Sequence, residues 1–177
     1  LMNNLKSDTK IRANRKNRLI TMFSLLYYTG LRVNETTQFT SKMILELIKE
    51  KTIIVETHKT KTERKLYITE NGQKELRKIF KDLKVSEDLL IRSERVTKTL
   101  DVQSVILDVN SYLTVVFGKE SRITSHSFRQ TLITELAQAS IKTKVIQTLI
   151  GHKSISSTLR YIKPSENDIV NSLNGVR

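Results

Sequence analysis

The run "NRLITMFSLLYY", residues 17–28, constrains the fold of this 177-residue chain more than any other stretch. Its side chains are apolar on nearly every side of a helix, which is typical of a helix buried at the centre of a domain. Gly30, which follows Thr29, is suited to ending this helix because glycine readily adopts the left-handed conformation. With five glycines and one proline, the chain is predicted to be rich in helices with few sharp breaks.

Beyond this run, the hydrophobic period predicts further helices and one β-hairpin. A helix is expected within residues 33–50, with Thr40 or Ser41 as its N-cap. Two segments rich in β-branched and aromatic residues, 53–57 and 65–69, flank a polar basic stretch and predict the hairpin. Additional helices are expected at 70–83, 101–117, 125–139, 142–152, 154–162 and 165–173. The predicted fold class is therefore mainly α with a small antiparallel β-sheet (α+β).

The charge of the chain favours a polyanionic partner. Lysine and arginine number 31 against 18 acids, a formal net charge of +13, whereas a magnitude of about 2–8 serves solubility in a small domain. Nucleic acid is the default partner for such an excess. The aspartates are scattered along the sequence, which argues against a nuclease or transposase that holds Mg²⁺ in a cluster of carboxylates.

Composition excludes several other classes of protein. The chain has no cysteine, which rules out disulfides, cysteine nucleophiles and thiolate metal sites. The sequence has no run of eighteen apolar residues, so we expect no membrane-spanning helix. The length and the hydrophobic content of 38% suit one soluble domain with its own core.

Arg129 is the first candidate for a binding residue. On a helix beginning near residue 125 it falls inside the apolar stripe of Phe128, Leu132 and Leu136. A buried guanidinium is costly without an anion, and the first turn of a helix itself favours an anion. His126 lies three residues away on a neighbouring face. The alternatives are that Arg129 pairs with a structural carboxylate or that its side chain snorkels to the surface.

Tyr161 is a candidate nucleophile. On a helix over 154–162, Ile155, Leu159 and Ile162 form one apolar stripe, and Tyr161 lies well off it. We therefore expect Tyr161 to have a role other than filling the core. A tyrosine becomes a nucleophile where cations stabilise its phenolate. The alternative is an ordinary surface tyrosine.

Arg32, in "TGLRVNE", directly follows the central helix, so its backbone is expected to be anchored to the core. Glu35, three residues later, can brace Arg32 if both lie on one helix face. The alternative is a weak surface ion pair.

The motifs "TGLRVNE", "HSFR" and "GHKSISSTLRY" occur in that order, with the basic hairpin between the first two. Together they resemble the catalytic domain of the tyrosine recombinases, the phage integrase family, over residues 17–163. The separations of 23 residues from Arg129 to His152 and nine from His152 to Tyr161 fit the family's spacing. One such motif is weakly specific, whereas three in order are strongly specific.

The resemblance implies a catalytic set of two arginines, two histidines, a hairpin lysine and a nucleophilic tyrosine: Arg32, Arg129, His126, His152, Lys59 and Tyr161. Glu35 matches the acid that supports the site. Lys61 is the alternative to Lys59, because the register of the hairpin is uncertain from sequence. Gln130 and Tyr67 stand where many members carry histidine and proline, and these departures bear on the subgroup rather than on activity.

The resemblance also implies the reaction. Tyr161 attacks a phosphodiester of double-stranded DNA to form a 3′-phosphotyrosyl link, while the two arginines and His152 bind the phosphate. Lys59 protonates the leaving 5′-oxygen, and His126 takes the tyrosine proton or orients the phosphate. The reaction requires no metal, ATP or other cofactor. Relaxation of DNA in the manner of a type IB topoisomerase and a catalytically inactive DNA-binding module are the alternatives.

The expected organisation has three parts. Residues 1–16 are predicted to be a linker or the remnant of a missing N-terminal DNA-binding domain, 17–163 the catalytic domain, and 164–177 a C-terminal tail helix. The resemblance implies that Ile169 and Leu173 insert into a neighbouring protomer within a tetrameric complex on DNA; the alternative is that the tail folds back onto its own domain. The resemblance further implies a cytoplasmic, nucleoid-associated protein of a prokaryote or phage.

Overall fold

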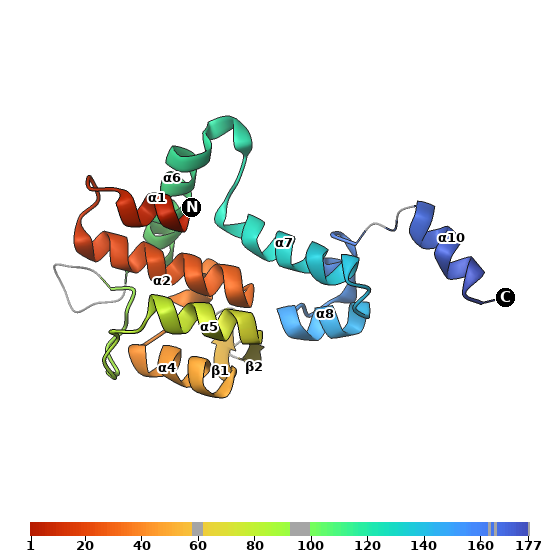
Figure 1. The fold of residues 1–177 in the computed structure, drawn as a ribbon, viewed down its shortest axis with the longest axis horizontal. Helices are drawn as coiled ribbons and strands as arrows, with labels where there is room; N and C mark the ends of the chain where they lie inside the picture. The colour runs from red at the N-terminus through yellow and green to blue at the C-terminus, as the bar shows by residue number, and fades with distance from the viewer. Residues whose placement is uncertain (58–61, 93–99, 163, 165, 177) are drawn as a thin grey trace. The chain divides into compact units, whose positions relative to one another are not determined.

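The computed structural model describes residues 1–57, 62–92, 100–162, 164 and 166–176, and the chain divides into two compact units, 1–129 and 130–177. The elements that begin in the first unit are α1 (Met2–Ser7), α2 (Ala13–Thr29), α3 (Val33–Thr36), α4 (Ser41–Glu50), β1 (Thr52–Thr57), β2 (Thr62–Tyr67), α5 (Glu70–Ile79), α6 (Val102–Phe117), the 3₁₀ helix η1 (Lys119–Ser121) and α7 (Ser125–Gln138). The second unit contains the remainder of α7, then α8 (Thr143–Ile150), α9 (Ile155–Leu159) and α10 (Glu166–Asn174). The predicted fold class, mainly helical with a small antiparallel sheet, is confirmed (Figure 1).

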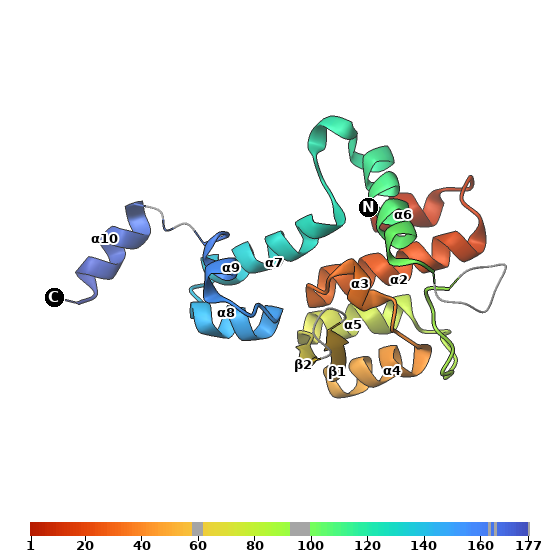
Figure 2. The ribbon, with the colours of Figure 1, turned by 180° about the vertical axis from the view of Figure 1, so that it is seen from behind.

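Helix α2 is the centre of the first unit, as its sequence predicts. Leu25 belongs to a cluster shared with α4, α5 and the hairpin, whereas Leu19, Met22 and Leu26 belong to a second cluster shared with α1 and α6. Figures 1 and 2 show these two groups of elements on opposite sides of α2. An apolar surface all round the helix is therefore needed to serve both clusters.

The end of α2 fixes the direction of the chain that follows. Gly30 has a φ of 63°, in the left-handed region, and its N–H donates to the carbonyl oxygen of Leu26. Glycine adopts this conformation at little cost, which confirms Gly30 as the residue that ends the helix. Leu31 is buried immediately afterwards, so the backbone of the next residue, Arg32, is anchored to the core.

The hairpin is antiparallel and has one face on the core. Its register pairs Ile53 with Leu66 and Val55 with Arg64. Ile53, Val55 and Leu66 are buried, and alternation along a strand puts Arg64 on their face. This register places a charged side chain at the inner surface of the sheet.

The bounds of two predicted elements are wrong. The second strand was expected at 65–69 but spans Thr62–Tyr67, and the helix expected at 70–83 ends at Ile79. Thr69 lies outside the strand because its hydroxyl accepts a hydrogen bond of 3.0 Å from the N–H of Gly72 and caps α5. A capping threonine and a strand threonine have the same composition, so β-propensity alone misplaced it.

Side chains cap the starts of α4 and α6, and α1 packs on the core of the first unit. The hydroxyl of Thr40 accepts a hydrogen bond of 3.2 Å from Met43 N–H at the start of α4, which confirms one of the two expected caps. The side chain of Asp101 caps α6 in the same way. In α1, Leu5 is fully buried in the cluster shared with α2 and α6.

The second unit has a small core of its own. Ile133, Ile146 and Ile150 are fully buried, with residues of α7 and α8 packed against them. Gly151, with a φ of 71°, ends α8. His152 follows it directly.

The apolar stripe predicted for 154–162 is wrong. Ile155 is 44% exposed and Leu159 is 49% exposed, whereas Tyr161 is partly buried with Ile162 against the core of the second unit. For Tyr161, the cause is the end of α9 at Leu159. Tyr161 N–H donates to the carbonyl oxygen of Thr158 in a turn, so the angles of a continued helix do not apply to it.

Helix α10 carries an exposed apolar face. Ile169, Val170 and Leu173 are 52%, 52% and 65% exposed. Among the described residues, no helix has both the length and the apolarity needed to cross a membrane.

Candidate active site

Arg32 is held by a carboxylate three residues ahead. Its backbone N–H donates to Oε2 of Glu35 at 2.9 Å, and its Nη1 lies 3.1 Å from Oε1 of the same side chain. Arg32 is the N-cap of α3, so the short helix itself fixes this spacing. The bracing contact expected from sequence is present, and the side chain of Arg32 keeps 40% of its surface exposed.

A second arginine, which is not among the residues predicted from sequence, reaches the same carboxylate. Nη2 of Arg64 lies 2.8 Å from Oε2 of Glu35, and both side chains are buried, at 8% and 1% exposure. Burial alone would raise the pKa of Glu35, but the charge of Arg64 and the hydrogen bonds from Arg64 and Arg32 outweigh it and hold the pKa below its ordinary value. Glu35 is therefore a buried anion at neutral pH.

Arg129 is buried as predicted, at 1% exposure. Its Nη1 donates a hydrogen bond of 2.7 Å to the backbone carbonyl oxygen of Gly30. The start of α7 is fixed nearby, because the side-chain oxygen of Asn110 accepts from Ser125 N–H at 2.8 Å. The first turn of α7 is thus attached both to α6 and to the end of α2.

His126 lies in this first turn, three residues before Arg129. The residue as a whole is exposed, but loss of solvation, followed by repulsion from the guanidinium groups of Arg129 and Arg32, lowers the pKa of His126 below its ordinary value of 6.5. The imidazole is therefore mainly neutral at neutral pH. In that form one ring nitrogen accepts a proton.

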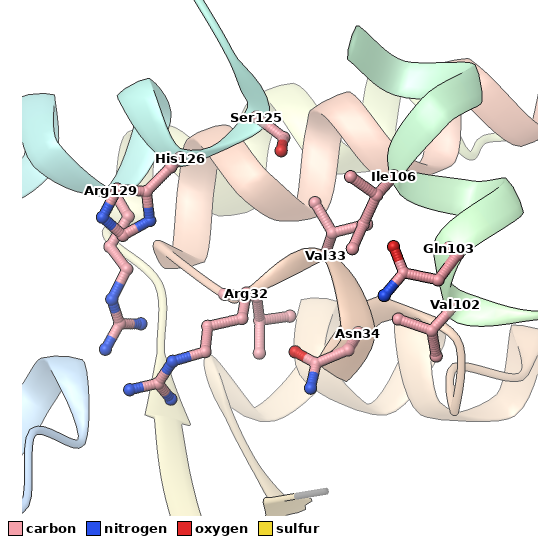
Figure 3. A pocket seen from close by; sticks show the side chains of 10 residues that line it. Arg32, Val33, Asn34, Val102, Gln103, Ile106, Ser125, His126 and Arg129 are labelled. Atoms are coloured by element: carbon pink, nitrogen blue, oxygen red, sulfur yellow. The ribbon is translucent and has the colours of Figure 1, made fainter. Parts of the chain in front are cut away.

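Arg32, His126 and Arg129 line one pocket of about 450 Å³ in the first unit. Figure 3 shows the guanidinium groups of Arg32 and Arg129 on the same side of the view as the imidazole of His126, with Asn34 and Gln103 on the other side. Two planar guanidinium groups each offer parallel N–H donors that match the oxygens of a phosphate, which a lysine does not reproduce. The arrangement suits an anion with several oxygens.

The second unit holds the other two predicted residues near each other. The rings of His152 and Tyr161 are stacked, with centroids 6.4 Å apart and planes 28° apart. Nδ1 of His152 and the hydroxyl oxygen of Thr158 are joined by a hydrogen bond of 2.9 Å, and Thr158 is fully buried. Thr158 is not among the site residues predicted from sequence.

Lys59 and its alternative Lys61 lie outside the described residues. In the part of the chain that the structure does describe, no three His, Asp or Glu side chains gather in a group that could hold a metal ion. The residues brought together in the first unit are Arg32, Glu35, His126 and Arg129, and those in the second unit are His152 and Tyr161.

Fold and site together define a class of protein: a mainly helical domain with a pocket whose arginines suit a phosphate ester. The sequence model of the phage integrase family matches residues 1–168. The chain belongs to the phage integrase family.

Individual relatives agree with this assignment. The chain is similar to tyrosine recombinase XerC of Leptospira interrogans, with 29% identity over 84% of this chain and 47% of the relative. It is also similar to tyrosine recombinase XerC of Rickettsia prowazekii, with 32% identity over 80% of this chain and 45% of the relative. The chain thus spans about half the length of the curated relatives it matches.

A solved structure supports the fold. The Tn1549 transposon integrase, in complex with a circular intermediate DNA, superposes with a TM-score of 0.68 at 18% identity, covering 99% of this chain and 62% of the integrase. At this identity the likeness concerns the fold alone.

Proposed function

We propose that this chain is the catalytic domain of a site-specific DNA recombinase or integrase. The observation that carries the proposal is the pocket of the first unit, where the braced Arg32 and the buried Arg129 line one cavity with His126. The substrate is double-stranded DNA, in accord with the net charge of +13. Family membership and the ordered motifs support the same substrate class.

The arginines supply electrostatic stabilisation. A phosphodiester gains negative charge on its non-bridging oxygens as the phosphorus becomes pentacoordinate, and preorganised cations lower the energy of that state. Arg32 and Arg129 bind these oxygens. Glu35 holds Arg32 in place.

The remaining residues carry the group transfer. The phenolic oxygen of Tyr161 forms a bond to phosphorus, and the bond from phosphorus to the 5′-oxygen breaks, leaving a 3′-phosphotyrosyl link. The neutral His126 accepts the tyrosine proton, and Lys59 donates a proton to the 5′-oxygen. His152 donates a hydrogen bond to the phosphate. Attack by another strand's 5′-hydroxyl reverses these steps, so no ATP is consumed. No metal ion takes part in the proposed reaction.

We further propose that residues 17–163 are the catalytic domain, that 1–16 lead from a further DNA-binding domain, and that 164–177 form an exchange segment. The exposed apolar side chains of α10 support the last point. In this proposal, protomers assemble as a tetramer on DNA in the cytoplasm of a prokaryote or phage host.

A suicide DNA substrate tests the proposal. A nick placed next to the cleavage position lets the short fragment that carries the new 5′-hydroxyl diffuse away. A covalent protein–DNA adduct therefore accumulates, and it migrates slowly on a denaturing gel. We expect the adduct with this chain, with or without EDTA, and none with Tyr161→Phe, which should still bind DNA. An adduct formed by Tyr161→Phe at the normal rate would disprove the assignment of the nucleophile. Relaxation of any supercoiled plasmid would favour topoisomerase activity instead.

A further inference from the structure

We propose that Arg64 is a positioning residue for the reaction: through Glu35 it sets the direction of the Arg32 guanidinium and leaves the charge of Arg32 available to a phosphate. This inference rests on the proposed function. Arg64 lies on β2, in a different element from Arg32, and its contact with Glu35 joins residues 29 positions apart in sequence.

The first observation is how the Glu35 carboxylate is shared. Among the described residues it accepts from three donors: Arg32 N–H and Arg64 Nη2 on Oε2, at 2.9 and 2.8 Å, and Arg32 Nη1 on Oε1, at 3.1 Å. Arg64 and the backbone therefore occupy one oxygen and leave the other to the Arg32 side chain. The carboxylate is 1% exposed, so water does not compete for it.

The second observation is the charge of this group. A carboxylate paired with Arg32 alone would neutralise the very charge that a phosphate needs. Two guanidinium groups around one carboxylate leave a net positive charge, and only Arg32 among the three side chains is substantially exposed, at 40% against 8% and 1%. The excess charge is thus presented at the pocket by Arg32, where an anion can bind it.

The third observation separates this role from attachment of the hairpin. The side-chain amide of Gln38 bonds the backbone of Glu56 in β1 twice, with Nε2 3.0 Å from the carbonyl oxygen and Oε1 3.0 Å from N–H. Nε2 also lies 3.0 Å from the carbonyl oxygen of Glu35. The amide therefore ties the hairpin to α3 independently of Arg64. Loss of Arg64 should disturb Glu35 and Arg32 while the strands remain in place.

The test compares two substitutions on one strand. Arg64→Gln removes the inner charge, and Lys65→Gln removes a charge from the neighbouring residue, which is exposed. Each protein is given suicide DNA carrying either a normal scissile phosphodiester or a methylphosphonate. The methyl group removes one charged non-bridging oxygen, so a correctly aimed guanidinium matters less for that substrate.

At saturating DNA we expect Arg64→Gln to cleave the phosphodiester about tenfold or more slowly, as a small misplacement of a positioned group does. Its rate on the methylphosphonate should fall by about threefold or less, because the charge that Arg32 stabilises is gone. Lys65→Gln should keep the wild-type ratio of the two rates. The inference would be overturned if Arg64→Gln lost the same factor in cleavage rate on both substrates, or lost none. A purely structural role would slow cleavage of the two substrates equally.

If circular dichroism shows that Arg64→Gln does not fold, Arg64→Lys takes its place in the assay. Lysine retains the charge but not the planar donor, so the ratio of rates should lie between those of wild type and Arg64→Gln. A wild-type ratio in the lysine variant would then refute a role for the guanidinium. If wild type itself forms no adduct, the proposed function fails; if wild type cleaves and the Arg64 variants match it, only the inference about Arg64 fails.

Discussion

The Arg129 guanidinium donates a hydrogen bond of 2.7 Å to the backbone carbonyl oxygen of Gly30, two residues before Arg32. Arg129 lies in the first turn of α7, far along the chain from Arg32, which is the N-cap of α3. Its guanidinium is nevertheless bonded to the short segment between α2 and α3 that contains Arg32. A bond to a backbone atom fixes position without neutralising charge. The main chain thus aligns Arg129, whereas the Glu35 carboxylate aligns the guanidinium of Arg32.

Replacement of Arg129 tests this alignment. Arg129→Lys keeps the charge but loses the fork that serves both the Gly30 carbonyl and an oxygen of the substrate. We expect cleavage of a suicide substrate to fall by about 10²- to 10³-fold, as for loss of one transition-state donor, while DNA affinity changes little. Arg18→Lys is a matched control, because Arg18 is 14% exposed and bonded to Asp108. Wild-type cleavage by Arg129→Lys would contradict the assignment.

Gly30 should resist replacement because of its conformation. Its φ of 63° is in the left-handed region, where a Cβ costs about 1–2 kcal/mol. Gly30→Ala should therefore lower the free energy of unfolding by about that amount, measured by urea denaturation. Gly30→Asn should be less destabilising, since asparagine tolerates this region better than other residues. Equal stability of wild type and the alanine variant would show that the conformation is not strained.

Prediction from sequence succeeded where a single periodic element determines the outcome. The burial of α2 and of Arg129 follows from the helical period, and Gly30 ends its helix because few residues adopt a left-handed φ at low cost. The contact of Arg32 with Glu35 follows because the two residues are three positions apart.

Sequence was a weaker guide where contacts depend on pairing between elements. Arg64 faces the core only because β2 pairs with β1 in one register, and a shift by one residue would have turned it outward. The only hint in the sequence was that Arg64 lies two positions before the apolar Leu66, and so on the same face of a strand. Thr158 is buried one residue before the end of α9, and the position of a helix end is poorly determined by pattern alone. The roles of the site residues and the limits of the domains stay predictions.

The buried Glu35 predicts a pH dependence of stability. Its pKa in the folded state lies below the ordinary value of 4.5, so the folded protein binds this proton less readily than the unfolded chain. The resulting stabilisation is fully present above about pH 4.5 and is lost as the pH falls through the folded-state pKa.

The difference in stability between wild type and Glu35→Gln should show the same pH dependence. The variant should be less stable than wild type at pH 7, by about 2 kcal/mol for a lost charged hydrogen-bonded partner, and the difference should shrink as the pH falls below about 4. Urea denaturation at several pH values measures it. A difference that stays constant down to acid unfolding would mean that Glu35 does not titrate below its ordinary range.

Thr158 is expected to act through His152. A hydroxyl that donates to Nδ1 leaves the proton on Nε2, which can then donate to a phosphate oxygen. Thr158→Val removes the hydroxyl at similar volume, and cleavage should fall about tenfold with DNA affinity nearly unchanged. Thr158→Ser should restore most of the rate.

Thr148→Val is the control for that experiment. Among the described residues, the Thr148 hydroxyl bonds only the carbonyl oxygen of Lys144, one turn earlier in α8, so its loss should leave cleavage within about twofold of wild type. The hypothesis fails if Thr158→Val cleaves as fast as this control, or if Thr158→Ser is as slow as the valine variant.

The apolar face of α10 is expected to serve assembly rather than binding by one protomer. A helix of nine residues is marginal by itself, and its exposed side chains, Ile169, Val170 and Leu173, would gain stability by packing on another protein surface. Ile169→Ser combined with Leu173→Ser should leave the affinity of single protomers for DNA nearly unchanged and abolish cooperative assembly, measured by gel shift over a range of protein concentrations. Val85→Ser, at a residue that is 73% exposed in the first unit, controls for the loss of a surface apolar group. If the double variant assembles and recombines as wild type does, α10 has no role in exchange between protomers.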